Sequence, residues 1–355
     1  MKKITLSGSS EEIGFLHGKL LAKEIHSNIK FYKAIFLQSF GEEARILDAA
    51  ENIKERIKEF NPRFINEIDR IALGAEVSEP LWLYALNSRT ELGMAINAGE
   101  CTAIVFPQHS VLGQTWDWAQ HLEGTSVMME IQFPSGHKLL QLTEAGIIGK
   151  IGFNNCGLGV TLNIIRIADA VLQGVPIHIV LRSVLESRTL DDALSAVERA
   201  RKGTASNIVI AQGGRAIDVE FAGGENIVYK IPDAVYVHTN HYLHTPEPVQ
   251  IDETACINST ARYHTAVEKL GKMEGFSSQE MISLFSHQSG AEHSILCPFK
   301  PHTQAEMGMV GTLATIVMDL DRRSIFVREG NPSSSSFLVD QFIEYNFENG
   351  SSPYD

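Results

Sequence analysis

The sequence predicts an α+β fold in which antiparallel sheets are covered by helices. Three observations lead to this class. The first hundred residues have the apolar spacing of helices, the spacing changes to that of strands after residue 100, and later strands pair as hairpins with pairs of helices between them. Strands joined as hairpins are antiparallel, and helices that come in separate blocks cover the faces of such sheets.

Helices account for most of the first hundred residues. Ser9 and Glu12 have the spacing of a capping box, and apolar residues follow them at helical steps. A second amphipathic stretch runs to Phe60, and Pro62 suits the first turn of a third helix. Residues 78–81 open a fourth helix. We therefore expect the first hundred residues to form a helical segment.

After residue 100 the apolar period becomes two. Residues 127–133 alternate apolar and polar side chains, as a half-buried strand does. Further strands are expected at 101–106, 147–153, 157–163, 205–211, 217–221, 233–239, 310–318 and 323–328, and helices at 175–201 and 257–286.

The composition excludes several classes of protein. The chain has 355 residues, of which 44% are hydrophobic and 21% charged, as is typical of globular proteins. Its 30 basic and 43 acidic residues give a net charge of −13, so we expect no nucleic acid and no membrane as partner. The chain has no apolar run of the roughly 18 residues of a membrane helix and no signal peptide. Four cysteines without a Cys-x-x-Cys pair indicate a reduced, cytoplasmic protein.

One cysteine stands where the helical segment ends and the first strand begins. This residue, Cys101, could act as a nucleophile, but a thiol requires a base to become a thiolate. His109 is the nearest histidine in the sequence, and the spacing does not decide whether it is that base. Taken alone, such a cysteine is most often a small buried apolar residue.

Two further polar groups have a simple interpretation when each is taken alone. In a strand, Trp116 and Trp118 share one face and Asp117 points to the other, where a carboxylate is usually solvated. Arg262 follows Asn258 at the opening of a helix, which is typical of a helix cap with a surface arginine.

Three histidines lie close together in residues 237–244. His238, His241 and His244 could bind a metal, but a tri-histidine zinc site normally draws its ligands from separate elements, and no acidic ligand is interleaved. The pattern therefore favours no metal site. Asn240, at the end of a strand, offers the uncharged N–H donor that an oxyanion hole requires.

Together, these pieces resemble the N-terminal nucleophile hydrolases and, among them, the acyl-coenzyme A:6-aminopenicillanic acid acyltransferase family. The resemblance covers nearly the whole chain and rests on the order and spacing of several motifs behind a leader of about a hundred residues. The motifs are Glu12-x-Gly14-x-x-His17-Gly18, Leu86-Asn-Ser-Arg-Thr-Glu91, Glu100-Cys101-Thr102, Gly113-Gln-x-Trp-Asp-Trp118, Gly157-Leu-Gly-Val-Thr-Leu-Asn163 and Thr239-Asn-His241.

This resemblance implies a four-layer αββα sandwich of two antiparallel sheets with an N-terminal helical segment. It also implies that the precursor cuts itself between Glu100 and Cys101. Residues 1–100 would then form a helical propeptide or α chain, and residues 101–355 would form the catalytic β chain. The two chains would stay associated, and the family implies no metal and no organic cofactor.

The resemblance also implies a role for each candidate residue. Cys101 would supply both the nucleophile and the base, because the cut frees its α-amino group. An α-amine titrates near pH ~7.7–8.0 and a thiol near ~8.5, so the two can exchange a proton at neutral pH. Asp117 would orient these groups, Asn240 would be the oxyanion donor, and Arg262 would stabilise charge around the nucleophile. The residues implied to bind substrate are Asn163, Trp116 and Thr102.

The implied activity is hydrolysis or acyl transfer on a small N-acyl compound, such as an N-acyl amino acid, amine or penicillin-like amide, through a thioester on Cys101. The expected partners are this small molecule and, for acyl transfer, acyl-coenzyme A; the sequence leaves open whether the chain forms a homo-oligomer. Two alternatives also stay open. One is a non-catalytic or unprocessed relative that acts as a binding module, and the other is a metallohydrolase that uses His238, His241 and His244.

Overall fold

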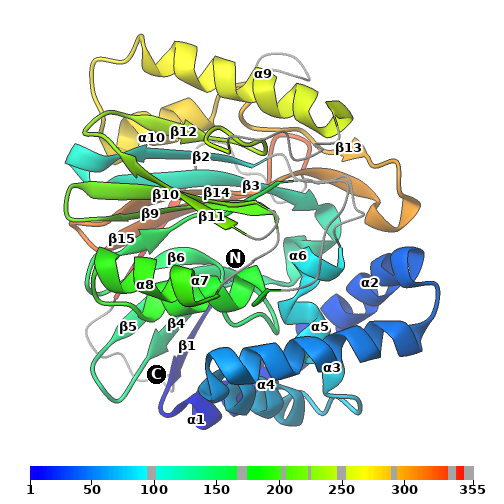
Figure 1. Cartoon of the computed structure of the whole chain (residues 1–355). Helices are drawn as coiled ribbons and strands as arrows, with labels where there is room; N and C mark the ends of the chain where they lie inside the picture. The colour runs from blue at the N-terminus through cyan, green and yellow to red at the C-terminus, as the bar shows by residue number, and fades with distance from the viewer. Residues whose placement is uncertain are drawn as a thin grey trace.

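Two β-sheets lie face to face between layers of helices (Figure 1). The structure is a computed structural model, and it describes residues 1–93, 101–165, 174–200, 205–222, 225–245, 253–288, 294–334 and 341–347. The helices are α1 (Ser10–Leu20), α2 (Ala22–Phe40), α3 (Glu43–Phe60), α4 (Pro62–Gly74), α5 (Leu81–Asn87), α6 (Arg89–Leu92), α7 (Ile177–Glu186), α8 (Leu190–Ala200), α9 (Glu253–Leu270) and α10 (Ser278–Phe285). Short 3₁₀ turns are η1 (Pro107–His109), η2 (Gln120–Gly124) and η3 (Ala305–Met307).

The strands of the described residues form one sheet of nine and one of seven. The first sheet has the order β1 (Lys2–Ser7), β4 (Ser126–Gln132), β5 (Lys138–Glu144), β6 (Ile151–Asn154), β7 (Gly159–Val160), β9 (Ser206–Gln212), β10 (Arg215–Ala222) and β11 (Glu225–Ile231), with β8 (Asn163–Ile164) beside β9. The second sheet has the order β12 (Tyr236–His238), β2 (Thr102–Phe106), β3 (Val111–Ala119), β14 (Met309–Asp319), β15 (Ser324–Glu329) and β16 (Ile343–Asn346), with β13 (Lys300–Pro301) beside β14.

The layers confirm the predicted α+β class of two antiparallel sheets covered by helices. In Figure 1, α9 and α10 cover the outer face of the second sheet, and α7 and α8 cover the first. One hydrophobic cluster fills the space between the sheets, and a second joins the outer face of β2 and β3 to α9 and α10. The described pairs are antiparallel except for β1 with β4.

The first strand corrects the prediction that the N-terminal hundred residues are helical throughout. Lys2–Ser7 forms β1, which pairs with β4 in parallel register from Lys2 opposite Val127 to Ser7 opposite Gln132. Ile4 and Leu6 alternate with less buried neighbours, which is the two-residue period of a strand. Six helices follow where four were expected, because the second stretch divides into α2 and α3 and the fourth into α5 and α6. Ser9 and Glu12 form the predicted capping box.

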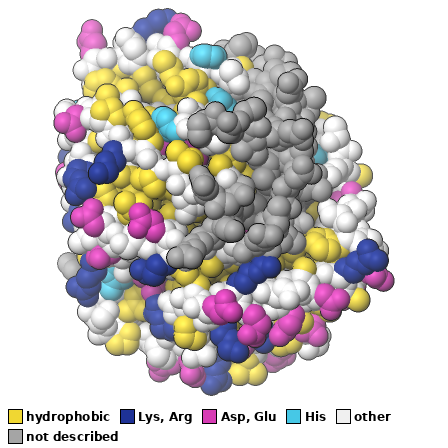
Figure 2. Space-filling model, viewed as in Figure 1, with side chains coloured by type: hydrophobic (Ala, Val, Ile, Leu, Met, Phe, Trp, Pro, Cys, Tyr) yellow, Lys and Arg dark blue, Asp and Glu magenta, His cyan; other side chains and the backbone are white. Residues whose placement is uncertain are grey.

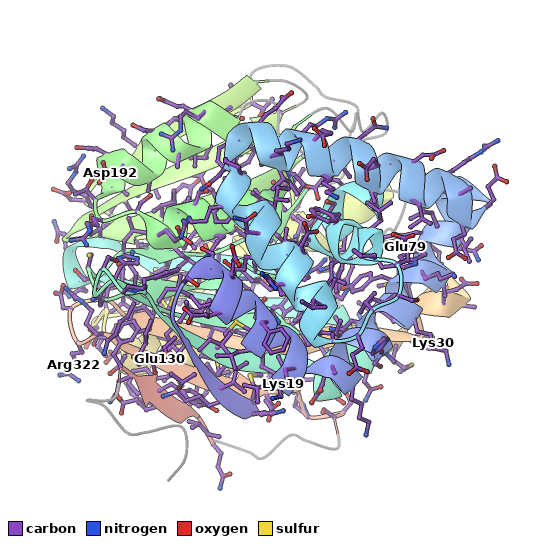
Figure 3. All side chains as sticks on the ribbon, turned by 90° about the horizontal axis from the view of Figure 1, so that it is seen from below. Lys19, Lys30, Glu79, Glu130, Asp192 and Arg322 are labelled. Atoms are coloured by element: carbon purple, nitrogen blue, oxygen red, sulfur yellow. The ribbon has the colours of Figure 1, made fainter. Side chains whose placement is uncertain are left out.

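We refer to residues 1–93 as the N-terminal segment. Its helix α4 contacts α7 through the ion pair of Glu67 with Arg182. The view from below labels the exposed Lys19 and Lys30 on its helices (Figure 3). On the face shown in Figure 2, acidic and basic side chains are interspersed over these helices. Among the residues that the structure describes, no helix has both the length and the apolar character needed to cross a membrane.

The expected hairpins are present, and several strands were missed. The pairs β6–β7, β9–β10 and β14–β15 confirm the hairpins predicted from alternation. The helical regions at 175–201 and 257–286 each divide into two helices, and Thr189 caps the second helix of the first region through the backbone N–H of Asp192, at 3.1 Å. β5 was not predicted, because six of its seven residues are buried and do not alternate with exposed ones.

Candidate functional site

Cys101 lies directly before β2, at the inner face of the second sheet. Thr102 is opposite Thr115 in the antiparallel register of β2 and β3, so the next pair brings Cys101 opposite Trp116. Both belong to the hydrophobic cluster between the sheets, and Cys101 is only 4% exposed. The predicted nucleophile is therefore buried in the uncut chain.

Two side chains donate hydrogen bonds to the carbonyl oxygen of Cys101. Asn163, on β8 of the first sheet, donates from Nδ2 at 3.0 Å, and Arg262, on α9, donates from Nη1 at 2.8 Å. The Oδ1 atom of Asn163 is buried and has no hydrogen-bond partner among the described residues. The backbone of Cys101 is thus held from both sides of the second sheet.

Arg262 also fixes the predicted oxyanion donor. Its Nη2 donates to Oδ1 of Asn240 at 2.8 Å, and its Nη1 donates to Oγ1 of Thr102 at 3.0 Å. Because Oδ1 of Asn240 is the acceptor, its Nδ2 is directed elsewhere and donates to the carbonyl of Ile164 at 2.8 Å. Arg262 is 1% exposed, so the surface position expected for it alone is wrong.

A buried ion pair holds the loop that carries Asn240. The ring nitrogens of His238 lie 2.7 Å from the carbonyl of Thr239 and 3.1 Å from Oε1 of Glu220. Both partners are acceptors, so both nitrogens carry protons. Burial opposes this charge, but Asp218 and Glu220 raise the pKa of His238 above its usual value. Glu220 also accepts from the backbone N–H of Leu243 and of the following residue, which ties the loop to β10.

The three histidines of residues 237–244 have separate partners. Nδ1 of His241 lies 2.8 Å from the hydroxyl of Ser259, and His244 stacks on Tyr229 with ring centroids 3.9 Å apart. Among the described residues, the one group with metal-ligand spacing contains His238 but neither of the other two, together with Asp218 and Glu220. The residues expected to bind a metal in the metallohydrolase alternative are therefore not brought together.

Asp117 is fully buried on β3, opposite Thr312 on β14. The solvated position expected for this carboxylate alone is therefore wrong. Burial raises the pKa of the Cys101 thiol to about 12, and the charge of Asp117 adds to this rise. Arg262 and Lys150 oppose it without reversing it. In the uncut chain the thiol therefore keeps its proton at neutral pH.

A buried charged cluster that the sequence did not predict lies near Cys101. Glu144 at the end of β5 accepts from Arg89 at 2.8 Å and from Lys150 at 2.5 Å on one oxygen, and from the Tyr32 hydroxyl at 2.6 Å on the other. Burial alone would raise the pKa of Glu144, but the two cations outweigh it and lower this pKa to about 2. The available signal was a single lysine inside the apolar run 147–153.

The Lys150 amine lies over the Trp116 ring, with Nζ 3.2 Å from the ring centroid. Burial lowers the pKa of Lys150 to about 7, although Glu144 favours the charged form. The backbone N–H of Lys150 donates to Oε1 of Gln141 at 2.9 Å, which fixes its position between the sheets.

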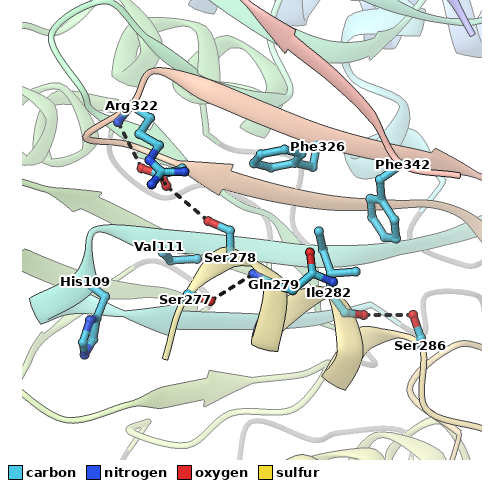
Figure 4. Close-up of a pocket in the computed structure, with 11 residues that line it drawn as sticks. His109, Val111, Ser277, Ser278, Gln279, Ile282, Ser286, Arg322, Phe326 and Phe342 are labelled. Atoms are coloured by element: carbon cyan, nitrogen blue, oxygen red, sulfur yellow. Dashed lines mark hydrogen bonds and ion pairs between the residues drawn. The ribbon is translucent and has the colours of Figure 1, made fainter. Parts of the chain in front are cut away.

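A cavity lies apart from the residues around Cys101 and Lys150. It has a volume of about 700 Å³ and lies between α10 and the strands β3, β14 and β15 (Figure 4). Ser277, Ser278, Phe326 and Phe342 are among the residues that line it. His109, the histidine nearest to Cys101 in the sequence, also lines this cavity, whereas Cys101, Asp117, Asn240 and Arg262 do not. Of the predicted positions, Glu100 lies outside the described residues.

Comparisons with known proteins give matches over most of the chain. The model of the family "Acyl-coenzyme A:6-aminopenicillanic acid acyl-transferase" matches residues 106–334. The 40 kDa form of the acyl-coenzyme A:6-aminopenicillanic-acid-acyltransferase of Emericella nidulans is 28% identical over 344 residues, which cover 94% of this chain and 94% of that protein.

Solved structures were also matched. Penicillin V acylase from Agrobacterium tumefaciens has 14% identity and a TM-score of 0.37, over 65% of this chain and 76% of that one. A mutant of the conjugated bile acid hydrolase from Clostridium perfringens has 10% identity and a TM-score of 0.43, over 70% of this chain and 93% of that one.

Proposed function

The chain belongs to the acyl-coenzyme A:6-aminopenicillanic acid acyl-transferase family, and from this premise we propose that Cys101 is a self-released nucleophile. The chain is an enzyme of a family of acyltransferases and amidases with the N-terminal nucleophile hydrolase fold. In our proposal the enzyme removes the acyl group from a small N-acyl compound. This compound is an N-acyl amino acid, an N-acyl amine or a penicillin-like amide. The location we expect for it is the cytoplasm.

The observation that carries this proposal is the convergence of hydrogen bonds on one cysteine. Asn163 and Arg262 both donate to the carbonyl of Cys101, and Arg262 also binds Asn240. Any buried backbone carbonyl needs a hydrogen-bond partner, but here two side chains from separate elements, one of them a buried arginine, meet on the carbonyl that directly follows the proposed cut. Buried polar side chains are costly to order around a residue that does no chemistry.

Self-cleavage between Glu100 and Cys101 would activate the protein. In the uncut chain the nitrogen of Cys101 is an amide, which cannot accept a proton. The cut converts it into an α-amine that titrates near pH ~7.7–8.0, next to its own thiol. The amine can then take the thiol proton, so the cut supplies the base of the reaction.

In the mature enzyme, the Cys101 thiolate would attack the carbonyl carbon of the N-acyl compound. The bond from carbonyl carbon to nitrogen then breaks, the α-ammonium protonates the departing amine, and a thioester remains on the sulfur. Water, or an acceptor amine or thiol, resolves the thioester. Nδ2 of Asn240 carries two N–H groups, and one of them donates to the carbonyl of Ile164. We assign the other to the developing oxyanion, and the free Oδ1 of Asn163 to an N–H of the substrate. Asp117 orients the α-amine.

Thr102 and Trp116 would bind substrate beside the nucleophile. Thr102 follows Cys101 directly, and Trp116 follows Thr115, the partner of Thr102, and belongs to the same buried cluster as Cys101, which supports this assignment. The N-terminal segment would stay bound after the cut, because β1 pairs with β4 along its whole length and Glu67 forms a buried ion pair with Arg182 at 2.8 Å.

Intact mass and terminal sequencing of the purified protein test the proposal. We expect two fragments, residues 1–100 and 101–355, that stay together during gel filtration. Cys101→Ala should remain one folded, inactive chain, whereas Cys156→Ala, a change of a partly exposed cysteine, should be cut as in the wild type. A single uncut wild-type chain that is nonetheless active would contradict the proposal.

Activity on a panel of N-acyl amino acids, N-acyl amines and acyl-coenzyme A thioesters identifies the acyl donor. A binding module would turn over no member of the panel. A metallohydrolase would lose activity with a chelator and keep it in Cys101→Ala. We expect the reverse on both counts.

A further inference from the structure

Lys150 is a buried titratable group that the proposed mechanism does not use. Its side chain is 1% exposed and forms an ion pair with Glu144, which is fully buried. Its Nζ also faces the ring of Trp116 at 3.2 Å from the centroid. A buried lysine changes its pKa readily, and enzymes use such lysines as bases.

Cross-strand register brings Lys150 close to the sulfur of Cys101. The register of β2 and β3 begins with Thr102 opposite Thr115, and its continuation by one residue would bring Cys101 and Trp116 to the same face, where opposite Cβ atoms are about 4.5–5.5 Å apart. Both side chains belong to the same buried cluster. Lys150 packs on that same tryptophan. In agreement with this proximity, the charges of Lys150 and Cys101 each influence the pKa of the other.

The backbone of Lys150 is held firmly in this position. Gln141 accepts a hydrogen bond from its N–H at 2.9 Å, and the carbonyl of Gly149 lies 2.9 Å from Nδ1 of His178. A Cβ atom added at Gly149 would lie 2.3 Å from the backbone oxygen of His178, so only glycine permits this close approach. The backbone at Lys150 is thus fixed, and the amine is held by Glu144 and by the ring of Trp116.

Self-cleavage requires a base that acts before the α-amine exists. The thiol of the uncut chain must lose its proton, yet burial and the charge of Asp117 raise the pKa of Cys101 to about 12. The nitrogen of Cys101 is still an amide at this stage, and the mature base therefore cannot start the reaction that produces it. A second proton acceptor is needed.

We propose that Lys150 accepts the proton of the Cys101 thiol in the uncut chain and returns it to the Cys101 nitrogen. The sulfur forms a bond to the carbonyl carbon of Glu100, and the bond between that carbon and the Cys101 nitrogen breaks. The Lys150 ammonium protonates the departing nitrogen, which leaves a thioester and a free α-amine. One water then hydrolyses the thioester to the Glu100 carboxylate and the thiol. This inference rests on the proposed self-cleavage.

The groups around Lys150 set the pH at which it can act. Glu144 on β5 favours the ammonium, while Arg89 on α6 and burial favour the neutral amine. His178 on α7 is kept neutral by burial and by these cations, which hold its pKa well below the usual range. The resulting pKa of Lys150 is about 7. Because the neutral amine is the active form, the cleavage rate should rise as the pH rises through about 7.

The test measures the cleavage of newly made full-length chain. The protein is produced by cell-free translation and moved into buffers on either side of pH 7, and the fraction cut is followed by intact mass. Lys150→Arg keeps a positive charge beside Glu144 but holds its proton at neutral pH. We expect this variant to be cut about 10²-fold more slowly or worse, without the rise near pH 7. Lys230→Arg, a change of an exposed lysine on β11, should behave as wild type.

A second variant keeps the proposal testable if Lys150→Arg does not fold, as judged by thermal unfolding in a Cys101→Ala background. Glu144→Gln removes the charge that favours the ammonium, so the midpoint of the pH profile should move down by about 1 unit or more. An unchanged rate and profile in both variants would overturn the role of Lys150 while leaving self-cleavage intact. A wild-type chain that is never cut would overturn the proposed function as well.

Discussion

Glu67 and Glu144 are two buried carboxylates that anchor the N-terminal segment, but their surroundings differ. Glu67, on α4, receives two bonds from Arg182 on α7, at 2.9 and 2.8 Å. Glu144, on β5, binds Arg89 of the N-terminal segment and also Lys150. Each pair joins the N-terminal segment to the rest of the chain across buried surface.

The balance of charge separates the two clusters. In the cluster of Glu67, one guanidinium, that of Arg182, binds two carboxylates, those of Glu67 and Glu186. Glu144 instead faces two cations, Arg89 and Lys150. An arginine does not release its proton in a protein, so the lysine is the group that can. An ion pair that secures the fold can therefore also leave a titratable amine beside a nucleophile.

Glu144→Gln should have the largest effect on stability. It leaves Arg89 and Lys150 buried without a counter-charge, and breaking a buried pair in this way costs about 3–5 kcal/mol. Denaturant unfolding of uncut chains in a Cys101→Ala background measures this loss, with Glu144→Asp as a variant that keeps the charge.

The matched change in the other cluster is Glu67→Gln. Arg182 keeps its bond to Glu186 at 2.7 Å and to the carbonyl of Ile148 at 2.8 Å, so the expected loss is about 2–3 kcal/mol. The pH profile of self-cleavage should not move in this variant. An equal shift of the profile in both variants would show that the two clusters do not differ in the way we describe.

The sequence predicted local structure well where a single segment carries the signal. The capping box of Ser9 and Glu12 and the hairpin β9–β10 depend on neighbouring residues, and both are present. β1 was missed because its alternation covers only six residues and its partner, β4, lies more than a hundred residues away in the sequence. β5 was missed because burial of both faces removes alternation.

The candidate site was also predictable only as far as local motifs reach. Cys101, Asn240 and Arg262 were selected through a resemblance in motif order, and each of them taken alone has an ordinary explanation. The structure brings them together through Arg262, but their catalytic roles stay predictions. Lys150 and Glu144 could not be paired from the sequence, since their shared environment arises only when the N-terminal segment packs against the first sheet.

The loss of folding stability at acidic pH should distinguish Glu144 from Glu67. The expected effect is intermediate in size. The folded pKa of Glu144 is about 2 against an ordinary 4.5, so its stabilisation is complete above pH 4.5 and is lost as the pH falls toward 2. The linked change is about 3 kcal/mol. For Glu67, burial raises the pKa instead, against the effect of Arg182, so this carboxylate contributes no such loss.

Unfolding in urea at several pH values between these limits checks the difference. In the Cys101→Ala background, the parent chain should lose more stability on acidification than Glu144→Gln does, while Glu67→Gln should keep the full acid loss. Parallel curves for the parent and Glu144→Gln would contradict the low pKa of Glu144.

Tyr32→Phe should have the smallest effect on folding stability. It removes the hydrogen bond to one oxygen of Glu144 and leaves the other oxygen with its partners. The hydroxyl donates to Oε2 of Glu144 and accepts from Nε1 of Trp118 at 3.0 Å, whereas Arg89 and Lys150 bind the other oxygen. Loss of the hydroxyl removes two buried hydrogen bonds but no charge, so the expected cost is about 1–2 kcal/mol. Because the two cations keep their contacts, the midpoint of the self-cleavage profile should stay in place. A midpoint displaced as far as in Glu144→Gln would mean that the hydroxyl, and not the carboxylate charge, controls the amine.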